Sequence, residues 1–531
     1  MKLLILILFI STGCLAYPKV NPYVESQNED RFSDFDMHPH VHRQHTSKIE
    51  GFAFKEEELT SEYWMNNAKA LVEEKVKRTL NTNKARNVIM FLGDGMSHYS
   101  LAAARLLLGG EDAKLSFETF PYTASSMTYC VDVQVADSAC TATAYLSGVK
   151  TNDGEIGVNA NATYENCYDG LNKANHVDSI AAWFQKANRS SGIVTTTRIT
   201  HATPAGAYAH TTSRDWEDDA KVQESGCSAT DNDDIAEQLV FGETGKNLKV
   251  ILGGGSRHFI GKSLTEHNTA GRRLDEKNLI YEWEKMDSNR TFVRNRAQLM
   301  GLNPKDVKQL FGLFNGDHLS YWIDVQRDGT QDTMPSLTDM TTKAIDILEL
   351  EKDGYFLLVE GGRIDHGHHR TQAKHAVTEA VEFSRAIEAA LKKVNLEETL
   401  IVVTADHGHV MTMSGYADRG GDIFGIAGKA TDDKPYMTLS YANGESFPQH
   451  SVAGERVDPS KLNGYIRNLN DLKFPATVPR EDETHGGEDV GIWSIGPWSH
   501  LFQGTLEQNV IAHIMAYASC VGDGIKACDN L

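Results

Sequence analysis

Continuous apolar runs recur along the chain, and helical patterns separate them. The runs are NVIMFLG from residue 87, SGIVTTT from 191, KVILGGG from 249, YFLLVEGG from 355 and TLIVVTADH from 399. Strands that are apolar on both faces and alternate with helices are typical of a mostly parallel sheet that helices cover on both sides. The sequence therefore predicts an α/β fold, and in such folds ligands bind at the carboxyl ends of the strands.

Two N-terminal segments precede this pattern. Residues 1–16 contain Lys2, an apolar run from Leu3 to Ile10 and small or neutral residues up to Ala16, which predicts a secretory signal peptide. Residues 17–50 are polar and carry histidines at positions 38, 40, 42 and 45. These histidines suit metal binding, but no hydrophobic scaffold lies nearby to fix them, so a linker is the favoured interpretation.

Residues 51–531 are predicted to form one α/β domain with two additions. At about 55–80 the apolar residues have helical spacing and charged partners lie four residues apart, which predicts an amphipathic helix ahead of the core. Residues 411–480 are rich in Gly, Pro, Asp and Asn with scattered apolar positions, which predicts an inserted subdomain.

Charge and cysteine content restrict the class of protein. The 52 basic and 73 acidic residues give a net charge of −21, which argues against nucleic-acid docking. Of the 7 cysteines, Cys14 lies in the predicted signal peptide, and the even number that remains suggests up to three disulfides in a secreted chain. Cys520 and Cys528 form the natural local pair, and the other pairings stay open.

Further features agree with secretion. N-x-S/T sequons at Asn161, Asn188 and Asn289 suit an extracellular glycoprotein. No stretch after the signal segment is long and apolar enough to predict a transmembrane helix. The C-terminal sequence is polar, so we do not expect a glycolipid anchor.

Carboxylates and imidazoles follow the predicted strands at the points where the strands end. They are Asp94 after the first run, His201 and Thr203 after the second, Glu360, Asp365, His366, His368 and His369 after the fourth, and Asp406, His407 and His409 after the fifth. A further cluster, ETHGGED, surrounds His485. Asp with His is a ligand set typical of zinc, whereas Asp, Glu and Thr suit magnesium. The repetition of such clusters predicts a polynuclear metal site rather than a series of helix caps.

The motif VADSACTATA places Ser138 directly after Asp137 at the predicted start of a helix. A helix N-terminus holds anions through its free N–H groups, although an Asp-Ser pair is also a common helix cap. No Ser-His-Asp or GxSxG context accompanies Ser138, so activation of its hydroxyl by a metal is the simplest hypothesis. Arg214, in HTTSRDW, is a candidate for gripping two oxygens of a tetrahedral anion.

These motifs resemble one family. VADSACTATAYLSGVKTN, VTTTRITHATPAGAYAHTTSRDW, VEGGRIDHGHH, TADHGH and THGGED are similar, in order and from about residue 55 to 528, to the alkaline phosphatases of the animal secreted or cell-surface type. The resemblance implies hydrolysis of phosphate monoesters through a phosphoserine intermediate, with an optimum at alkaline pH. Ser138 would be the nucleophile, and Arg214 would clamp the phosphate.

The resemblance also implies the metals and their ligands. One zinc ion would be held by Asp365, His369 and His485, a second by Asp94, Asp406 and His407, and magnesium by Asp94, Thr203 and Glu360. Asp137, His201 and His366 would lie beside the phosphate. Near LFGLFNGD and TQDTMPSL, Asn315 and Met334 stand where the family's calcium site would have carboxylates, which argues against calcium here.

Assembly and disulfides follow from the same resemblance. The insertion at 411–480 would be the family's crown at a homodimer interface, and the 55–80 helix would be an arm that embraces the other subunit. Cys167 with Cys227 and Cys520 with Cys528 would match the family's disulfides, while Cys130 and Cys140 are left either bonded to each other or free.

The sequence argues against three rival functions. A sulfatase would need a cysteine in a C-x-P-x-R context, which Cys140 does not have, and a phosphodiesterase would lack the pairing of Ser138 with Arg214. A catalytically silent binding protein on the same fold would be expected to lack some of the metal ligands, and the chain contains every one.

Overall fold

A ten-stranded sheet runs through the computed structural model, which describes residues 55–467 and 470–530. In spatial order its strands are β21 (Gly504–Glu507), β2 (Tyr122–Met127), β20 (Val490–Ile495), β10 (Thr399–Ala405), β1 (Asn87–Gly93), β9 (Tyr355–Gly361), β3 (Ser190–Arg198), β4 (Val250–Gly254), β8 (Gln309–Leu313) and β7 (Arg290–Val293). All neighbours are parallel except β20, which runs antiparallel to both β10 and β2. The predicted mostly parallel sheet is therefore confirmed, and the predicted segments 1–16 and 17–50 lie outside the described residues.

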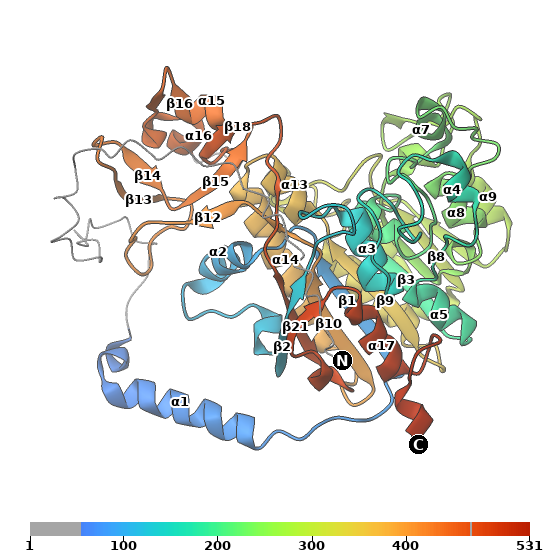
Figure 1. Ribbon diagram of the computed structural model, residues 1–531, viewed down its shortest axis with the longest axis horizontal. Coiled ribbons are helices and arrows are strands. Elements are labelled where there is room, and N and C mark those ends of the chain that lie inside the picture. The colour runs from blue at the N-terminus through green and yellow to red at the C-terminus, as the bar shows by residue number, and fades with distance from the viewer. Residues whose placement is uncertain (1–54, 468–469, 531) are drawn as a thin grey trace, which may run out of the picture. The chain divides into compact units, whose positions relative to one another are not determined.

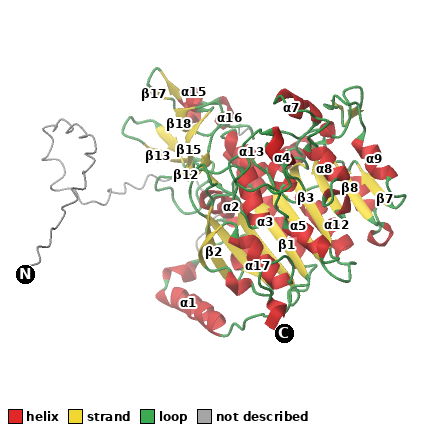
Figure 2. Ribbon diagram, turned by 45° about the vertical axis from the view of Figure 1, so that its right-hand side comes forward, coloured by secondary structure: helices red, strands yellow, loops and turns green. Residues whose placement is uncertain are grey.

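Helices cover both faces of the sheet, as Figure 2 shows. Along β1, Ile89 and Phe91 pack into a core beneath the helices of one face, while Val88 and Met90 pack into a second core on the other. The first core includes α2 (His98–Gly109), α12 (Leu337–Leu348) and α14 (Ala373–Leu391), and the second includes α3 (Ser138–Ser147), α5 (Ile180–Lys186), α8 (Ile235–Phe241) and α17 (Val510–Ser519). Alternation of side chains across a strand explains why each predicted run is apolar throughout.

Three helices begin near the strand ends and position polar side chains. They are α3, α6 (Ala202–Ala205) after β3, and α13 (Arg363–His369) directly after β9. The side chain of Asp137 caps α3 by accepting a hydrogen bond from the Cys140 N–H, and Gly148 ends the helix with φ of 72°. Such caps satisfy backbone groups that a helix end leaves free. Further short helices lie between the strands: α4 (Cys167–Leu171), α7 (Asp219–Glu224), α9 (Leu279–Lys285), α10 (Arg296–Gly301) and α11 (Trp322–Asp328).

Residues 411–480 form small sheets of their own, apart from the large one (Figure 1). One contains β12 (Met411–Met413), β15 (Leu439–Gly444) and β18 (Ala476–Pro479), and two hairpins pair β13 (Ile426–Lys429) with β14 (Pro435–Met437) and β16 (Ser451–Val452) with β17 (Glu455–Arg456). Two short helices, α15 (Phe447–His450) and α16 (Asn463–Ile466), lie among them. Frequent turns break this segment into short strands, which is what its Gly- and Asp-rich composition favours.

A helix, α1 (Ser61–Val76), lies within the segment 55–80 for which the sequence predicts an amphipathic helix, and it stands apart from the sheet in Figure 1. None of its residues is buried, and Trp64, Met65 and Val72 are each more than half exposed. Arg419 forms ion pairs with Asp112 and with Glu58, which lies in the short turn before this helix. Among the described helices, none combines the length and the apolar character needed to cross a membrane.

Three disulfides join the described cysteines. Cys167 is bonded to Cys227 and Cys520 to Cys528, as the resemblance implies. Cys130 is bonded to Cys140, which decides the pairing that the sequence left open.

Candidate active site

The strand ends at the centre of the sheet bring the predicted ligands together. In the parallel register Leu92 of β1 lies opposite Glu360 of β9, and Gly93 lies opposite Ala405 of β10. Asp94 and Asp406, which follow these strands, therefore emerge side by side. Gly95 turns the chain with φ of 62°, and its N–H donates to Asp406 Oδ1 at 2.9 Å.

One cluster consists of Asp94, Asp406 and His407. Their nearest ligand atoms all lie within 4.8 Å of one another, and the three side chains are fully buried. His407 Nε2 is 3.2 Å from Asp406 Oδ2 and 3.6 Å from Asp94 Oδ1. Two carboxylates and an imidazole that converge on one point match the ligand set of a catalytic zinc site.

A second cluster joins Asp365 and His369 of α13 with His485 of the short strand β19 (His485–Gly486). Asp365 Oδ1 is 3.3 Å from His369 Nε2 and 3.4 Å from His485 Nε2, and the two imidazole nitrogens are 3.1 Å apart. Backbone carbonyls accept from the other ring nitrogens: Glu483 O from His369 at 2.5 Å and Ala136 O from His485 at 2.7 Å. Such partners fix the tautomer that leaves Nε2 free for a metal.

A third group surrounds Glu360. Ligand atoms of Asp94, His201 and Glu360 lie within 4.8 Å of one another. The hydroxyls of Thr195 and Thr197 donate to Glu360 Oε2, and Thr203 also interacts with this carboxylate. Oxygen ligands of this kind are the ones that magnesium prefers.

The carboxylates of the site are buried, and buried carboxylates require neighbouring positive charge to remain ionised. Burial, together with the neighbouring Asp406, raises the pKa of Asp94 well above its ordinary value, and burial raises the pKa of Glu360 to about 7. Asp94 Oδ2, Asp406 Oδ2 and Glu360 Oε1 are buried without a hydrogen-bond partner among the described residues. Buried carboxylates of this kind are normally paired or bound to metal, so the donor set fits divalent cations.

Ser138 faces the first cluster from the N-terminus of α3. Its Oγ is 3.2 Å from His407 Nε2 and 3.5 Å from Asp94 Oδ1, and the side chain is buried. The free N–H groups and the dipole at the start of the helix favour negative charge at this position.

Arg214 reaches the same place from the loop after α6. Its Nη1 donates to Asp137 Oδ2 at 2.9 Å, and its Nη2 lies 3.1 Å from His201 Nε2. Burial, with the positive charge of Arg214 close by, lowers the pKa of His201 to about 3. His201 is therefore a neutral imidazole beside the guanidinium.

His366 belongs to a row of imidazoles that the sequence analysis found only in part. Its ring lies 5.4 Å from that of His201 and 4.2 Å from that of His318. His318 follows β8 in the motif FNGDH, and its Nδ1 accepts from the Arg198 N–H at 3.1 Å. A cavity of ≈600 Å³ opens beside this row, and its lining includes Tyr321 and Arg363.

His409 and Glu483 together support Asp365. The sequence predicts His409 only as an imidazole at a strand end, and it does not single out Glu483. His409 Nε2 is 2.7 Å from Asp365 Oδ1, and its Nδ1 is 2.5 Å from Glu483 Oε2. Burial alone would lower the pKa of His409, but these two carboxylates raise it to about 10. Glu483 precedes His485 in ETHGGED, and this motif is the sequence feature from which Glu483 could have been identified.

The region where the resemblance would place calcium contains an ion pair instead. Arg294 Nε donates to Glu266 Oε1 at 2.9 Å in a cavity of ≈260 Å³ that Met334 also lines. Asn315 uses its amide on its own loop, donating to His318 O at 2.6 Å. One carboxylate that is already paired with a guanidinium does not fit a calcium ion, which takes several oxygen ligands.

The fold and the site define a class: an α/β protein with candidate metal-ligand clusters at the strand ends and a serine at a helix N-terminus. The model of the alkaline phosphatase family matches residues 85–521. The tissue-nonspecific alkaline phosphatase of Homo sapiens is 42% identical over 495 residues, which are 89% of this chain and 91% of that protein. The membrane-bound alkaline phosphatase of Bombyx mori is 40% identical over 487 residues, with 89% and 87% covered.

Among solved structures, alkaline phosphatase from Thermus thermophilus has a TM-score of 0.59 at 21% identity and covers 86% of this chain and 96% of its own. That likeness supports the fold. The chain belongs to the alkaline phosphatase family, and it is a hydrolase of phosphate monoesters. Enzymes of this family depend on metals, in agreement with the candidate ligand clusters.

Proposed function

We propose that Ser138 is the nucleophile that takes the phosphoryl group from the substrate. Its hydroxyl would release a proton to solvent, and Oγ would form a bond to phosphorus as the bond to the ester oxygen breaks. The alcohol would leave with a proton from solvent. Water would then attack the phosphoserine, releasing inorganic phosphate and returning a proton to Ser138. The observation that carries this proposal is the distance of 3.2 Å from Ser138 Oγ to His407 Nε2, within a group of buried acids.

The metal ligands are proposed to be those that the sequence analysis expects. Zinc would be held by Asp365, His369 and His485 and by Asp94, Asp406 and His407, and magnesium by Asp94, Thr203 and Glu360. When bound, such cations lower the pKa of an oxygen nucleophile and neutralise charge on a phosphoryl group. The oxygens of Asp94, Asp406 and Glu360 that have no hydrogen-bond partner among the described residues support this assignment.

Arg214 and α3 would hold the phosphate. The guanidinium, oriented by Asp137, offers two parallel N–H donors to phosphate oxygens, and the N–H groups at the start of α3 that Asp137 does not cap add further donors. His201 and His366 would border the phosphate without carrying charge, because burial lowers the pKa of both imidazoles.

The test is hydrolysis of p-nitrophenyl phosphate at about pH 9, where deprotonated ligands favour metal binding. Chelation should abolish turnover, and added zinc and magnesium should restore it. Ser138→Ala should eliminate the labelled phosphoenzyme while it retains the metals, as measured by inductively coupled plasma mass spectrometry. Normal turnover by this variant would reject Ser138 as the nucleophile.

We further propose that the protein is a secreted homodimer. Asn161, Asn188 and Asn289 are all exposed, which supports glycosylation outside the cell. The exposed apolar side chains Trp64 and Met65 of α1 support an arm that packs on a second copy. Sedimentation should give a dimer for the parent and a monomer for Trp64→Glu/Met65→Glu, whereas a dimeric variant would exclude the arm as a main contact.

A further inference from the structure

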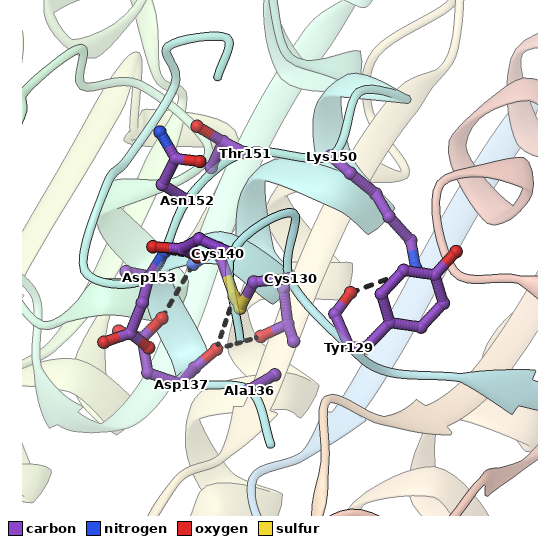
Figure 3. Close-up of a disulfide and its surroundings, with 12 residues drawn as sticks. Tyr129, Cys130, Ala136, Asp137, Cys140, Lys150, Thr151, Asn152 and Asp153 are labelled. Atoms are coloured by element: carbon purple, nitrogen blue, oxygen red, sulfur yellow. Dashed lines mark hydrogen bonds between the residues drawn. A yellow bond between two sulfur atoms is a disulfide. The ribbon is translucent and has the colours of Figure 1, made fainter. Parts of the chain in front are cut away.

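A disulfide closes a short ring of chain around the proposed catalytic segment. Cys130 and Cys140 are ten residues apart in sequence, and the chain between them contains Ala136, Asp137 and Ser138. Cys130 follows β2, and Cys140 lies in the first turn of α3. Figure 3 shows the bridge beside Ala136 and Asp137. Both ends of the segment that carries the nucleophile are therefore fixed by one covalent bond.

The three enclosed residues contact three different parts of the site. Ala136 O accepts from His485 Nδ1 at 2.7 Å. Asp137 Oδ2 accepts from Arg214 at 2.9 Å, and Ser138 Oγ lies 3.2 Å from a histidine of the first cluster. A shift of this short segment would move a proposed zinc ligand, the phosphate clamp and the nucleophile together.

The bridge is also the buried anchor of the loop between β2 and α3. Residues 131, 132, 134 and 135 are exposed, so this stretch contributes little packing. Cys130 and Cys140 are only 3% and 2% exposed, and they pack with Ala136 into a small apolar cluster separate from the two large cores. The position of Ala136 therefore depends directly on the two bonded side chains.

Hydrogen bonds extend the ring to the loop after α3. Val131 N donates to Thr151 O at 3.0 Å, and the N–H groups of Asp153 and Gly154 donate to the carboxylates of Asp132 and Asp137 at 2.9 and 3.1 Å. Figure 3 shows Thr151 and Asp153 beside the bridge. These hydrogen bonds connect the loop after α3 to the ring. Each of them can open in thermal fluctuations, whereas the disulfide is covalent and stays closed unless it is reduced.

We propose that the Cys130–Cys140 disulfide is a positioning element for phosphate binding, which holds Asp137 so that Arg214 is aimed at the phosphate and holds Ala136 so that His485 is aimed at zinc. The inference rests on the proposed roles of Arg214 and His485. Binding groups act at full strength only when their geometry is set in advance, and a displacement of about 1 Å costs up to about a hundredfold.

The test compares two disulfides of similar ring size. Cys130→Ala/Cys140→Ala removes the bridge at the site, and Cys520→Ala/Cys528→Ala removes one between α17 and the C-terminal turn, with a separation of 8 residues. We expect the inhibition constant of inorganic phosphate to rise at least about tenfold in the first variant and less than about twofold in the second. Zinc content after gel filtration should fall in the first variant alone. Equal phosphate affinity and equal zinc content in the two variants would overturn the proposal.

A double-mutant cycle distinguishes an effect of the bridge on the position of Arg214 from a general loss of rigidity around the site. In an Arg214→Ala background, with zinc added to saturation so that the effect through His485 is excluded, loss of the Cys130–Cys140 bridge should raise the phosphate inhibition constant less than about threefold, because the clamp that it positions is already absent. If removal of the bridge raises the inhibition constant in that background as much as it does in the parent, while zinc is retained, the proposal is overturned.

A measurement on the parent covers the case in which the alanine variant does not fold. The native protein is treated with a phosphine reductant and an alkylating agent, and modified cysteines are mapped by mass spectrometry. Phosphate affinity should fall in step with modification of Cys130 and Cys140, and unchanged affinity after their modification would overturn the inference. A parent without phosphate inhibition or Ser138-dependent turnover would instead reject the proposed function.

Discussion

Asp137 accepts a hydrogen bond from Arg214 at 2.9 Å through Oδ2, while its Oδ1 caps helix α3. One carboxylate therefore orients the proposed phosphate clamp and completes the helix whose first residue is the proposed nucleophile. The two functions use different oxygens, so substitutions can separate them.

Asp137→Asn should keep an oxygen for the cap but lose the ion pair, whereas Asp137→Ala should lose both. We expect both variants to raise the phosphate inhibition constant several-fold, because Arg214 is no longer oriented. The alanine variant should also lose about 1 kcal/mol of unfolding free energy relative to the asparagine variant. Inhibition assays and urea unfolding measure the two effects. Unchanged phosphate affinity in both variants would show that Arg214 does not depend on Asp137.

Glu483→Gln should weaken zinc binding without removing a proposed ligand. Glu483 accepts from His409 at 2.5 Å and from the Val410 N–H at 2.9 Å, and His409 in turn contacts Asp365. Loss of such outer partners typically costs about 10- to 100-fold in metal affinity. Competition with a zinc-selective chelator provides the measurement. Glu382→Gln, a buried glutamate that bonds Thr338 instead, is the matched control, and equal zinc affinity in the two variants would contradict the prediction.

Glu379→Gln should stabilise the protein at alkaline pH. Burial raises the pKa of Glu379 to about 7, although the Trp322 N–H donates to it. The folded state therefore keeps this proton between about pH 4.5 and 7 while the unfolded state releases it, so stability falls as pH rises through that window. The variant should gain about 2–3 kcal/mol over the parent at pH 9 relative to pH 4.5.

Urea unfolding at the two pH values provides the measurement for Glu379→Gln. Glu388→Gln, an exposed site on the same helix, controls for the loss of a carboxylate. A gain for Glu379→Gln that does not change with pH would show that Glu379 is ionised in the folded state throughout.

Calcium should neither bind nor stabilise the protein. The Arg294 guanidinium already pairs with Glu266, and Asn315 and Met334 provide no carboxylate. Added calcium should leave the melting temperature unchanged, and the purified protein should contain no stoichiometric calcium by mass spectrometry. Arg294→Ala should cost less than about 1 kcal/mol, because the pair is partly exposed. A melting temperature that rises with calcium would refute the prediction.

Local patterns in the sequence predicted the framework of the sheet. Runs such as NVIMFLG became β1, whose residues are all buried, because a strand covered on both faces must be apolar throughout. Parallel strands end at one edge, so Asp94 and Asp406 were expected to meet, and the register of β1 and β10 places them side by side. The antiparallel strand β20 was not anticipated, since strand direction leaves no mark on an apolar run.

The sequence by itself determined the fold class, the residues at the strand ends and the family, because hydrophobic periodicity and short motifs are local properties. Only the tertiary structure decided the contacts between distant segments: the Cys130–Cys140 bridge, the support of His409 by Glu483, and the pair of Arg294 with Glu266. Each depends on where two segments that are distant in the sequence or differently structured meet in space, and the residues that form them carry no local pattern that specifies a partner.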